Sequence, residues 1–210
     1  MSLRITPTDK ILFYGDSITD AGRERNNPLS HGAGYVKLID AALGLHFASP
    51  ALQVLNQGIS GHRIYDLEAR LETDLLAHAP TIVTFLIGIN DVWRRYDSKK
   101  ESPLNEFTDS FHRVLTRIRG ALHPQLVLME PFLLPVPEDR RMWREDLDPK
   151  ISAVRDLAIE FGADLIPLDG LFAAASSRAP AAFWLPDGVH PTNAGHALIA
   201  DAWVRNAGLS

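Results

Sequence analysis

The chain has 210 residues, 46% of them hydrophobic and 22% charged, which is within the ordinary range for soluble globular proteins. A chain of this length can bury a sufficient core without disulfides or a structural metal, so we expect one domain over residues 1–210. The absence of cysteine excludes a disulfide scaffold, a thiol nucleophile and a thiolate zinc site. Twenty-one basic and 26 acidic residues give a net charge of −5, which argues against nucleic acid as a partner.

The N-terminal region shows no targeting signal. Its apolar run, residues 11–14, is far shorter than the core of a signal peptide and is followed by acidic residues. No apolar stretch approaches the roughly 18 residues that a membrane span requires. We therefore expect a cytoplasmic protein without a membrane span, and the sequence leaves open whether it forms a homo-oligomer.

Short apolar runs alternate along the chain with segments of helical period, a pattern typical of an α/β protein with a mainly parallel sheet. Five runs are too continuously apolar to be half-exposed and predict buried strands, at residues 10–14, 53–56, 81–87, 125–130 and 164–167. Segments of helical spacing predict helices at residues 34–43, 65–78, 103–122, 149–161 and 192–206. The expected fold is a three-layer α/β/α sandwich with a five-stranded sheet.

The segment 131–149 differs from the rest of the chain because it contains four prolines together with three arginines and Trp143. This composition predicts a long loop rather than a strand or helix. Long loops of this kind often carry function.

Four polar segments stand where a parallel sheet would place a ligand, at the carboxyl ends of strands or just before the last helix. They read GDSITD at 15–20, NQGISG at 56–61, GIND at 88–91 and DGVH at 187–190. In this order they resemble the four blocks of the GDSL, or SGNH, hydrolases, a family of serine esterases with a flavodoxin-like sandwich fold. The only departure in the first block is Ile18, which stands where the family name has leucine.

The resemblance also bears on the second block, which holds two glycines. The functional glycine of the family usually closes an Asn-x-x-Ile-Ser-Gly pattern, and this pattern favours Gly61 over Gly58. Within the family, a short chain with Trp184 shortly before Asp187-x-x-His190 is similar to the members that deacetylate carbohydrates.

The residues themselves point to the same chemistry. Serine becomes a nucleophile when a base removes its proton, and histidine is the usual base because its pKa lies near neutrality. Asp187 and His190 are three positions apart, so a turn would bring the carboxylate beside the ring; with Ser17 they form the predicted catalytic triad. The predicted oxyanion hole consists of the Ser17 N–H, the Gly61 N–H and the Asn90 side chain.

Each of these residues also has a simpler interpretation. Ser17 could be only a helix N-cap, and Asn90 with Asp91 could cap the segment that follows. Gly61 could merely permit a turn. Ser60 is a weak competitor as nucleophile.

Other catalytic motifs are absent from the sequence. It contains no Gly-x-Ser-x-Gly elbow, dinucleotide-binding fingerprint, Walker sequence or His-Glu-x-x-His pair. Asp187 and His190 supply only two potential metal ligands. We therefore predict no cofactor and no metal.

The substrate is less well defined by the sequence. Trp93 and Trp184 lie close to the motif residues and are candidate substrate-binding residues, with Trp143 a third indole in the proline-rich segment; each could instead pack against its own loop. No apolar lid is evident, so we expect hydrolysis of small esters, foremost acetylated oligosaccharides. Two alternatives remain: a lysophospholipase or thioesterase of the same family, and a non-catalytic carbohydrate-binding α/β module.

Overall fold

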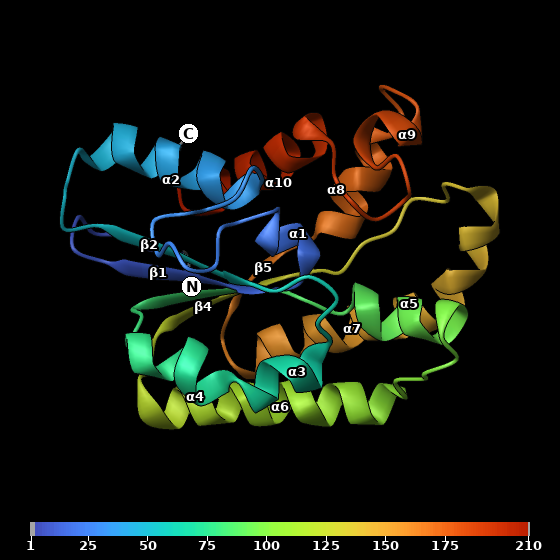
Figure 1. Ribbon diagram of the computed structural model, residues 1–210, viewed down its shortest axis with the longest axis horizontal. Helices are drawn as coiled ribbons and strands as arrows, with labels where there is room; N and C mark the ends of the chain where they lie inside the picture. Colours follow the sequence, from blue (N-terminus) through green and yellow to red (C-terminus); the bar gives the residue numbers. More distant parts are fainter. Residues whose placement is uncertain (1–2, 210) are drawn as a thin grey trace.

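The computed structural model describes residues 3–209 and contains a five-stranded parallel sheet between two layers of helices (Figure 1). The strands are β1 (Lys10–Gly15), β2 (Gln53–Gly58), β3 (Ile82–Leu86), β4 (Gln125–Met129) and β5 (Asp164–Ile166). Their order is β2-β1-β3-β4-β5, and every neighbouring pair is parallel. The predicted sandwich is confirmed. In this order the chain reverses its direction of winding between β1 and β3, and ligand sites of such sheets lie at the strand ends near that point.

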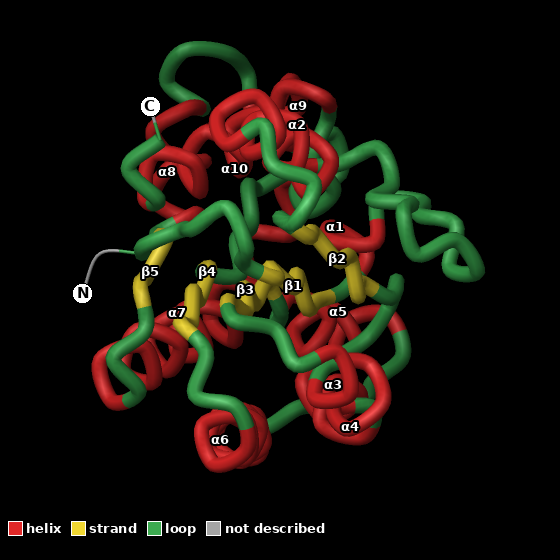
Figure 2. Tube along the Cα trace, turned by 90° about the vertical axis from the view of Figure 1, so that its left-hand side faces the viewer, coloured by secondary structure: helices red, strands yellow, loops and turns green. Residues whose placement is uncertain are grey.

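The helices divide between the two faces of the sheet (Figure 2). One face carries α1 (Ser17–Asp20), α2 (Tyr35–Phe47), α8 (Leu168–Ala175), α9 (Ala181–Trp184) and α10 (Asn193–Asn206). The other carries α3 (Ile64–Ala69), α4 (Leu71–Asp74), the short 3₁₀ helix η1 (Leu76–His78), α5 (Ile89–Asp97), α6 (Leu104–Ala121) and α7 (Arg144–Glu160). A second 3₁₀ helix, η2 (Glu138–Trp143), directly precedes α7.

The central strand β1 explains why these segments read as continuously apolar. Ile11 and Phe13 belong to the core on one face of the sheet, whereas Leu12 and Tyr14 belong to the core on the other face. Successive side chains of a strand point to opposite faces, so a strand covered on both sides needs apolar residues at every position.

The helix predicted at 65–78 and the loop predicted at 131–149 both differ from the structure. The expected helix at 65–78 is divided into α3, α4 and η1, with the first break at Arg70. The Arg70 guanidinium donates to the carbonyl of Gly15 (3.2 Å) and lies over the Tyr14 ring. This contact with a distant strand competes with the local helical period, which cannot reveal it.

The prediction that 131–149 is a loop holds only for residues 131–137, because η2 follows and α7 begins at Arg144. The missed signal is the spacing of Trp143, Leu147 and Ile151, which are four residues apart and all buried. Pro149 lies inside α7. Its missing N–H leaves one carbonyl of the preceding turn without its helical partner, a defect that the packing of this apolar face tolerates. None of the helices in residues 3–209 has the length and apolar character needed to cross a membrane.

Candidate active site

Ser17 is the first residue of α1, directly after β1. Asp16, not Ser17, caps this helix: its Oδ1 accepts the N–H of Ile18 at 3.0 Å. The interpretation of Ser17 as a helix cap is therefore wrong, and its hydroxyl is free for another partner. Ser17 Oγ lies 2.9 Å from Nε2 of His190.

His190 and Asp187 lie on the loop between α9 and α10. His190 Nδ1 is 2.7 Å from Asp187 Oδ2, while Asp187 Oδ1 accepts the backbone N–H groups of Val189 (3.0 Å) and His190 (2.7 Å). The turn needs glycine at position 188, where φ is +81° and a Cβ would lie 2.4 Å from the Leu134 carbonyl oxygen. With Nδ1–H directed at the carboxylate, Nε2 faces Ser17 as a proton acceptor.

The charges in this pair stabilise one another. The hydrogen bond to Asp187 raises the pKa of His190 above its ordinary value, and partial burial opposes the effect. For Asp187, burial acts to raise the pKa, but the hydrogen bonds from the His190 ring and from two backbone N–H groups outweigh it and lower the pKa well below its ordinary range. Asp187 is thus ionised at any working pH and can stabilise a protonated His190.

Two carboxyl groups behind the serine are in the opposite situation, because they are almost completely buried. Burial raises the pKa of Asp16 to about 7, and it raises that of Asp91 to about 7 as well. Asp91 accepts hydrogen bonds from Ser102 Oγ (2.8 Å) and from the N–H of Ile64 (3.2 Å). Asp91 thereby connects the start of α5 to the start of α3.

Asn90 is the second residue of α5 and is buried. Its Nδ2 donates to the carbonyl of His62 at 3.1 Å, which places the side chain beside the loop that contains Gly61. An amide group has two N–H bonds, so the second can serve another acceptor. Gly88 occupies the cap position of α5, so the interpretation of Asn90 or Asp91 as a cap is wrong.

The two glycines of the second block have different surroundings. The Gly58 N–H donates to Asn56 Oδ1 at 2.9 Å, and a Cβ at position 58 would lie 2.2 Å from the Asp20 nitrogen. Gly61 has φ of +84°. Within residues 3–209, neither the Gly61 N–H nor the Ser17 N–H donates to another group of the chain. Close packing against Asp20 explains why position 58 is a glycine. The Gly61 N–H, by contrast, is available as a hydrogen-bond donor.

Ser60 has no histidine beside its hydroxyl. Its Oγ and its N–H both donate to Oδ2 of Asp20, each at 3.0 Å, and the same carboxylate oxygen accepts from Arg25 at 3.1 Å. Hydrogen bonding to a carboxylate fixes this hydroxyl in a structural role on the β2 side of α1.

Aromatic side chains extend from His190 to the η2 segment. The Trp93 ring lies 5.6 Å from the His190 ring and 5.4 Å from the Trp143 ring, and Tyr96 stacks on Trp143 at 5.0 Å. Arg140 is not predicted as a site residue by the sequence, yet its guanidinium lies over Trp93 and donates to the Asp187 carbonyl. The only sequence signal was the mixture of basic and aromatic residues within 131–149.

Trp184 has a different environment from Trp93. It lies on α9, where Phe183 packs edge-to-face against its ring at 5.0 Å and the Arg178 guanidinium lies 5.3 Å over the ring. Its carbonyl accepts the N–H of Thr192. None of these contacts involves Ser17, Asp187 or His190, and a substrate-binding role for Trp184 stays a prediction.

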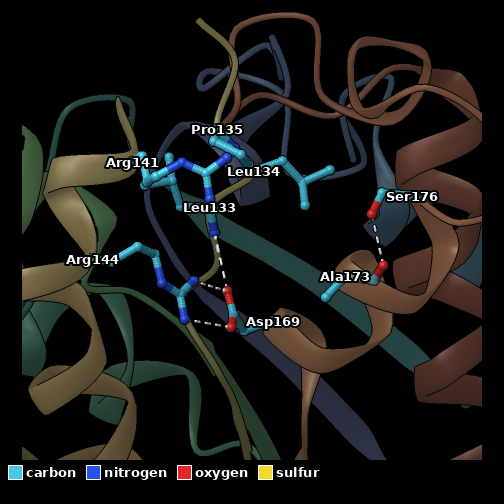
Figure 3. Close-up of a pocket in the computed structure, with 8 residues that line it drawn as sticks. All are labelled: Leu133, Leu134, Pro135, Arg141, Arg144, Asp169, Ala173 and Ser176. Carbon is cyan, nitrogen blue, oxygen red and sulfur yellow. Dashed lines mark hydrogen bonds and ion pairs between the residues drawn. The ribbon is translucent and has the colours of Figure 1, made fainter. Parts of the chain in front are cut away.

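A cavity of about 290 Å³ lies beside the η2 segment and not at Ser17 (Figure 3). On one wall, Arg144 binds Asp169 through two hydrogen bonds of 2.7 and 2.9 Å, and the same carboxylate accepts the N–H of Leu133. This ion pair joins the start of α7 to α8. Among residues 3–209, no three His, Asp or Glu side chains are grouped so that they could hold a metal ion.

Comparison with known proteins assigns this architecture to one family. Residues 13–198 match the GDSL-like lipase/acylhydrolase family. An acetylxylan esterase from Geobacillus stearothermophilus is 34% identical over 99% of this chain and 97% of its own length. A protein from Parabacteroides merdae, assigned to the GDSL-like lipases, superimposes with a TM-score of 0.95 at 33% identity over the full length of both chains.

Solved structures of the Geobacillus acetylxylan esterase include catalytic mutants. One in which a serine is replaced by alanine superimposes on this chain with a TM-score of 0.89 at 30% identity, covering 99% of this chain and 98% of that one. Two more catalytic mutants replace an aspartate and a histidine that stand three positions apart, and another structure describes the enzyme as an acetyl-xylooligosaccharide esterase. The match to the family model and the full-length similarity to this esterase show that the chain belongs to the GDSL-like lipase/acylhydrolase family and is a carboxylic ester hydrolase.

Proposed function

We propose that the protein is a serine esterase that removes acetyl groups from carbohydrates, with Ser17, His190 and Asp187 as its catalytic triad. The observation that carries the proposal is the continuous pair of hydrogen bonds, 2.9 Å from Ser17 Oγ to His190 Nε2 and 2.7 Å from His190 Nδ1 to Asp187 Oδ2. The relative's catalytic mutants support it, because they affect the same three residue types with the same Asp–His spacing.

The reaction proceeds in two halves. In the first, His190 Nε2 accepts the Ser17 hydroxyl proton while Oγ attacks the ester carbonyl carbon. When the tetrahedral intermediate collapses, the bond to the sugar oxygen breaks, and His190 returns its proton to that oxygen. In the second half, His190 accepts a proton from water, the hydroxide attacks the acetyl-Ser17 carbonyl, and acetate leaves as Oγ regains the proton.

The negative charge of each tetrahedral intermediate requires donors that are already in place. The Ser17 and Gly61 N–H groups and the second Nδ2–H of Asn90 fill this role in our proposal. Two observations support this proposal. Neither of the two backbone N–H groups donates to another group within residues 3–209, and a hydrogen bond to the His62 carbonyl holds the Asn90 side chain in place. Gly61 suits its position because its φ is positive, a conformation that a side chain would strain.

The acyl specificity that we propose is for short chains. Trp93 lies against His190, next to the atoms that react, and a bulky ring in this place leaves less space for a long acyl chain. The names of the relative, acetylxylan esterase and acetyl-xylooligosaccharide esterase, favour acetylated sugars over lipids. Trp184 remains a candidate for stacking on a sugar ring.

A panel of chromogenic esters together with acetylated xylo-oligosaccharides tests the proposal. We expect kcat/KM to fall from acetate to butyrate and octanoate, although each methylene in an open pocket would gain about 0.8 kcal/mol by burial. A steady rise towards octanoate would instead identify a lysophospholipase or thioesterase.

Covalent labelling separates the esterase from a carbohydrate-binding module. An organophosphonate should attach once, at Ser17, because among the serines of residues 3–209 only this one has a histidine within hydrogen-bond distance that is itself bound to a carboxylate. Sugar binding without labelling or ester hydrolysis would favour the binding module. A strong chelator should leave the rate unchanged, and loss of activity restored by zinc would refute the serine mechanism.

A further inference from the structure

Arg140 connects the η2 segment to the loop that carries Asp187 and His190. We propose that Arg140 is a positioning residue, which holds the base in place through the Asp187 carbonyl and through the Trp93 ring. Its consequence for catalysis rests on the function proposed above, whereas its effect on His190 can be measured without any substrate.

The Arg140 guanidinium contacts both the loop of Asp187 and the ring that packs on His190. One Arg140 nitrogen, Nη1, donates to the Asp187 backbone carbonyl. The Cζ atom of the group lies over the Trp93 ring, 4.4 Å from its centre, and over the Trp143 ring, 4.7 Å from its centre. A planar guanidinium can stack and donate in its plane at the same time, which a lysine ammonium cannot do. Since Trp93 also packs on the His190 ring, Arg140 reaches both members of the Asp–His pair.

The η2 helix is itself held firmly, so it can act as a support. Trp143 at its end is buried, and Arg144 in the next position forms the two hydrogen bonds to Asp169 seen in Figure 3. On the other side, the N–H of Leu134 donates to the Gly188 carbonyl at 3.0 Å. The loop with Asp187 is therefore bound to the 134–144 segment at two points, one by backbone and one by Arg140.

The charge of Arg140 also acts on the pKa of His190. The charged or titratable groups that face His190 are Asp187 on its own loop, Asp16 before α1, Arg140 on η2 and His196 on α10. The two carboxyl groups favour the protonated ring, and Arg140 is the cation that opposes it. Removing the Arg140 charge should therefore move the pKa of His190 upward.

The neighbouring Arg141 provides a matched control. It stands on the same turn of η2, is exposed, and pairs only with Glu138, at 2.5 Å, among the ion pairs of the described residues. Arg141→Ala removes the same charge from the same short helix without touching Asp187 or Trp93. Exposed pairs of this type contribute little to stability.

The experiment compares Arg140→Ala, Arg140→Lys and Arg141→Ala with the unmodified protein. Steady-state kinetics on an acetate ester give kcat and KM, and an NMR titration of the ring carbon signals gives the pKa of His190. For Arg140→Ala we expect kcat to fall roughly 10- to 100-fold with KM nearly unchanged, since a misplaced base affects the chemical step. We also expect the pKa of His190 to rise.

Arg140→Lys should keep the pKa of His190 near its original value, because the charge is retained, and should recover only part of the kcat. Arg141→Ala should match the unmodified protein in all three quantities.

Several results would overturn the proposal. They are an unchanged kcat and an unchanged His190 pKa in Arg140→Ala, equal losses in Arg141→Ala, or a lower melting temperature with normal kcat per folded molecule. If Arg140→Ala does not fold, Arg140→Lys decides, and a kcat equal to that of the unmodified protein then refutes the positioning role. Should the unmodified protein hydrolyse no ester, the proposed function fails, and the titration still tests Arg140.

Discussion

The two halves of the candidate active site are built in different ways. Ser17, Gly61 and Asn90 follow the ends of β1, β2 and β3, and the carboxyl groups beside them, Asp16 and Asp91, are completely buried. Asp187 and His190 instead stand on a loop between two helices, with side chains 37% and 46% exposed. The nucleophile side is fixed by the sheet, whereas the base side depends on side chains contributed by other segments.

Hydrogen bonds to backbone groups, several of them from the Asn56 side chain, hold the nucleophile side in place. Asn56, at the centre of these contacts, donates through Nδ2 to the carbonyls of Thr19 (2.7 Å) and His31 (2.9 Å) and accepts the Gly58 N–H. The N–H of Ile59 donates to the Gly15 carbonyl. These bonds connect the loops after β1 and β2, so the donors near Ser17 are held before substrate arrives.

We expect the largest effect from the proposed triad. Loss of Ser17 on the nucleophile side or of Asp187 on the base side should each nearly abolish hydrolysis. Ser17→Ala should lower kcat by about 10⁴-fold or more, and Asp187→Asn by about 10⁴-fold, because the asparagine favours the wrong tautomer of His190. Circular dichroism should show both variants folded. If Asp187→Asn kept more than a tenth of the activity, the base side would not need its carboxylate, and the two-part description would be wrong.

A smaller effect is expected within the nucleophile side. Asn90→Ala removes one oxyanion donor and should lower kcat by about 10²- to 10³-fold with little change in KM. Asn105→Ala, at an exposed position of α6, is the matched control and should be without effect. A normal rate in Asn90→Ala would remove this residue from the proposed oxyanion hole and confine its role to the His62 contact.

The smallest effect comes from pH and reports mainly on the base side, although the buried carboxyl groups of Asp16 and Asp91, with pKa values of about 7, also titrate in this range. His190 must be neutral to accept a proton, and its bond to Asp187 raises its pKa above 6.5. We therefore expect kcat/KM to fall about tenfold per pH unit as the pH decreases below that raised pKa. Asp187 does not titrate in this range because its pKa is lowered. A profile that stays flat to pH 5 would show that His190 is not the base.

The same contrast explains how much the sequence could reveal. Strand ends and short motifs depend on local pattern, so the five buried strands and the positions of Ser17, Gly61 and Asn90 at strand ends could be anticipated. Arg140 and its stacking on Trp93 depend on where η2 lies relative to the last loop, and no local pattern contains this information. The prolines of 131–149 also masked the helical spacing of Trp143 and Leu147.

The hydrogen bond between Ser17 and His190 joins residues 173 positions apart. Folding must bring the two residues together, because Ser17 follows the first strand and His190 shortly precedes the last helix. The last helix must then dock on the first strand, where Trp203 packs against Phe13 and donates to Thr84 Oγ1. Until this helix has docked, the proposed nucleophile Ser17 therefore lacks the proposed base that would activate it.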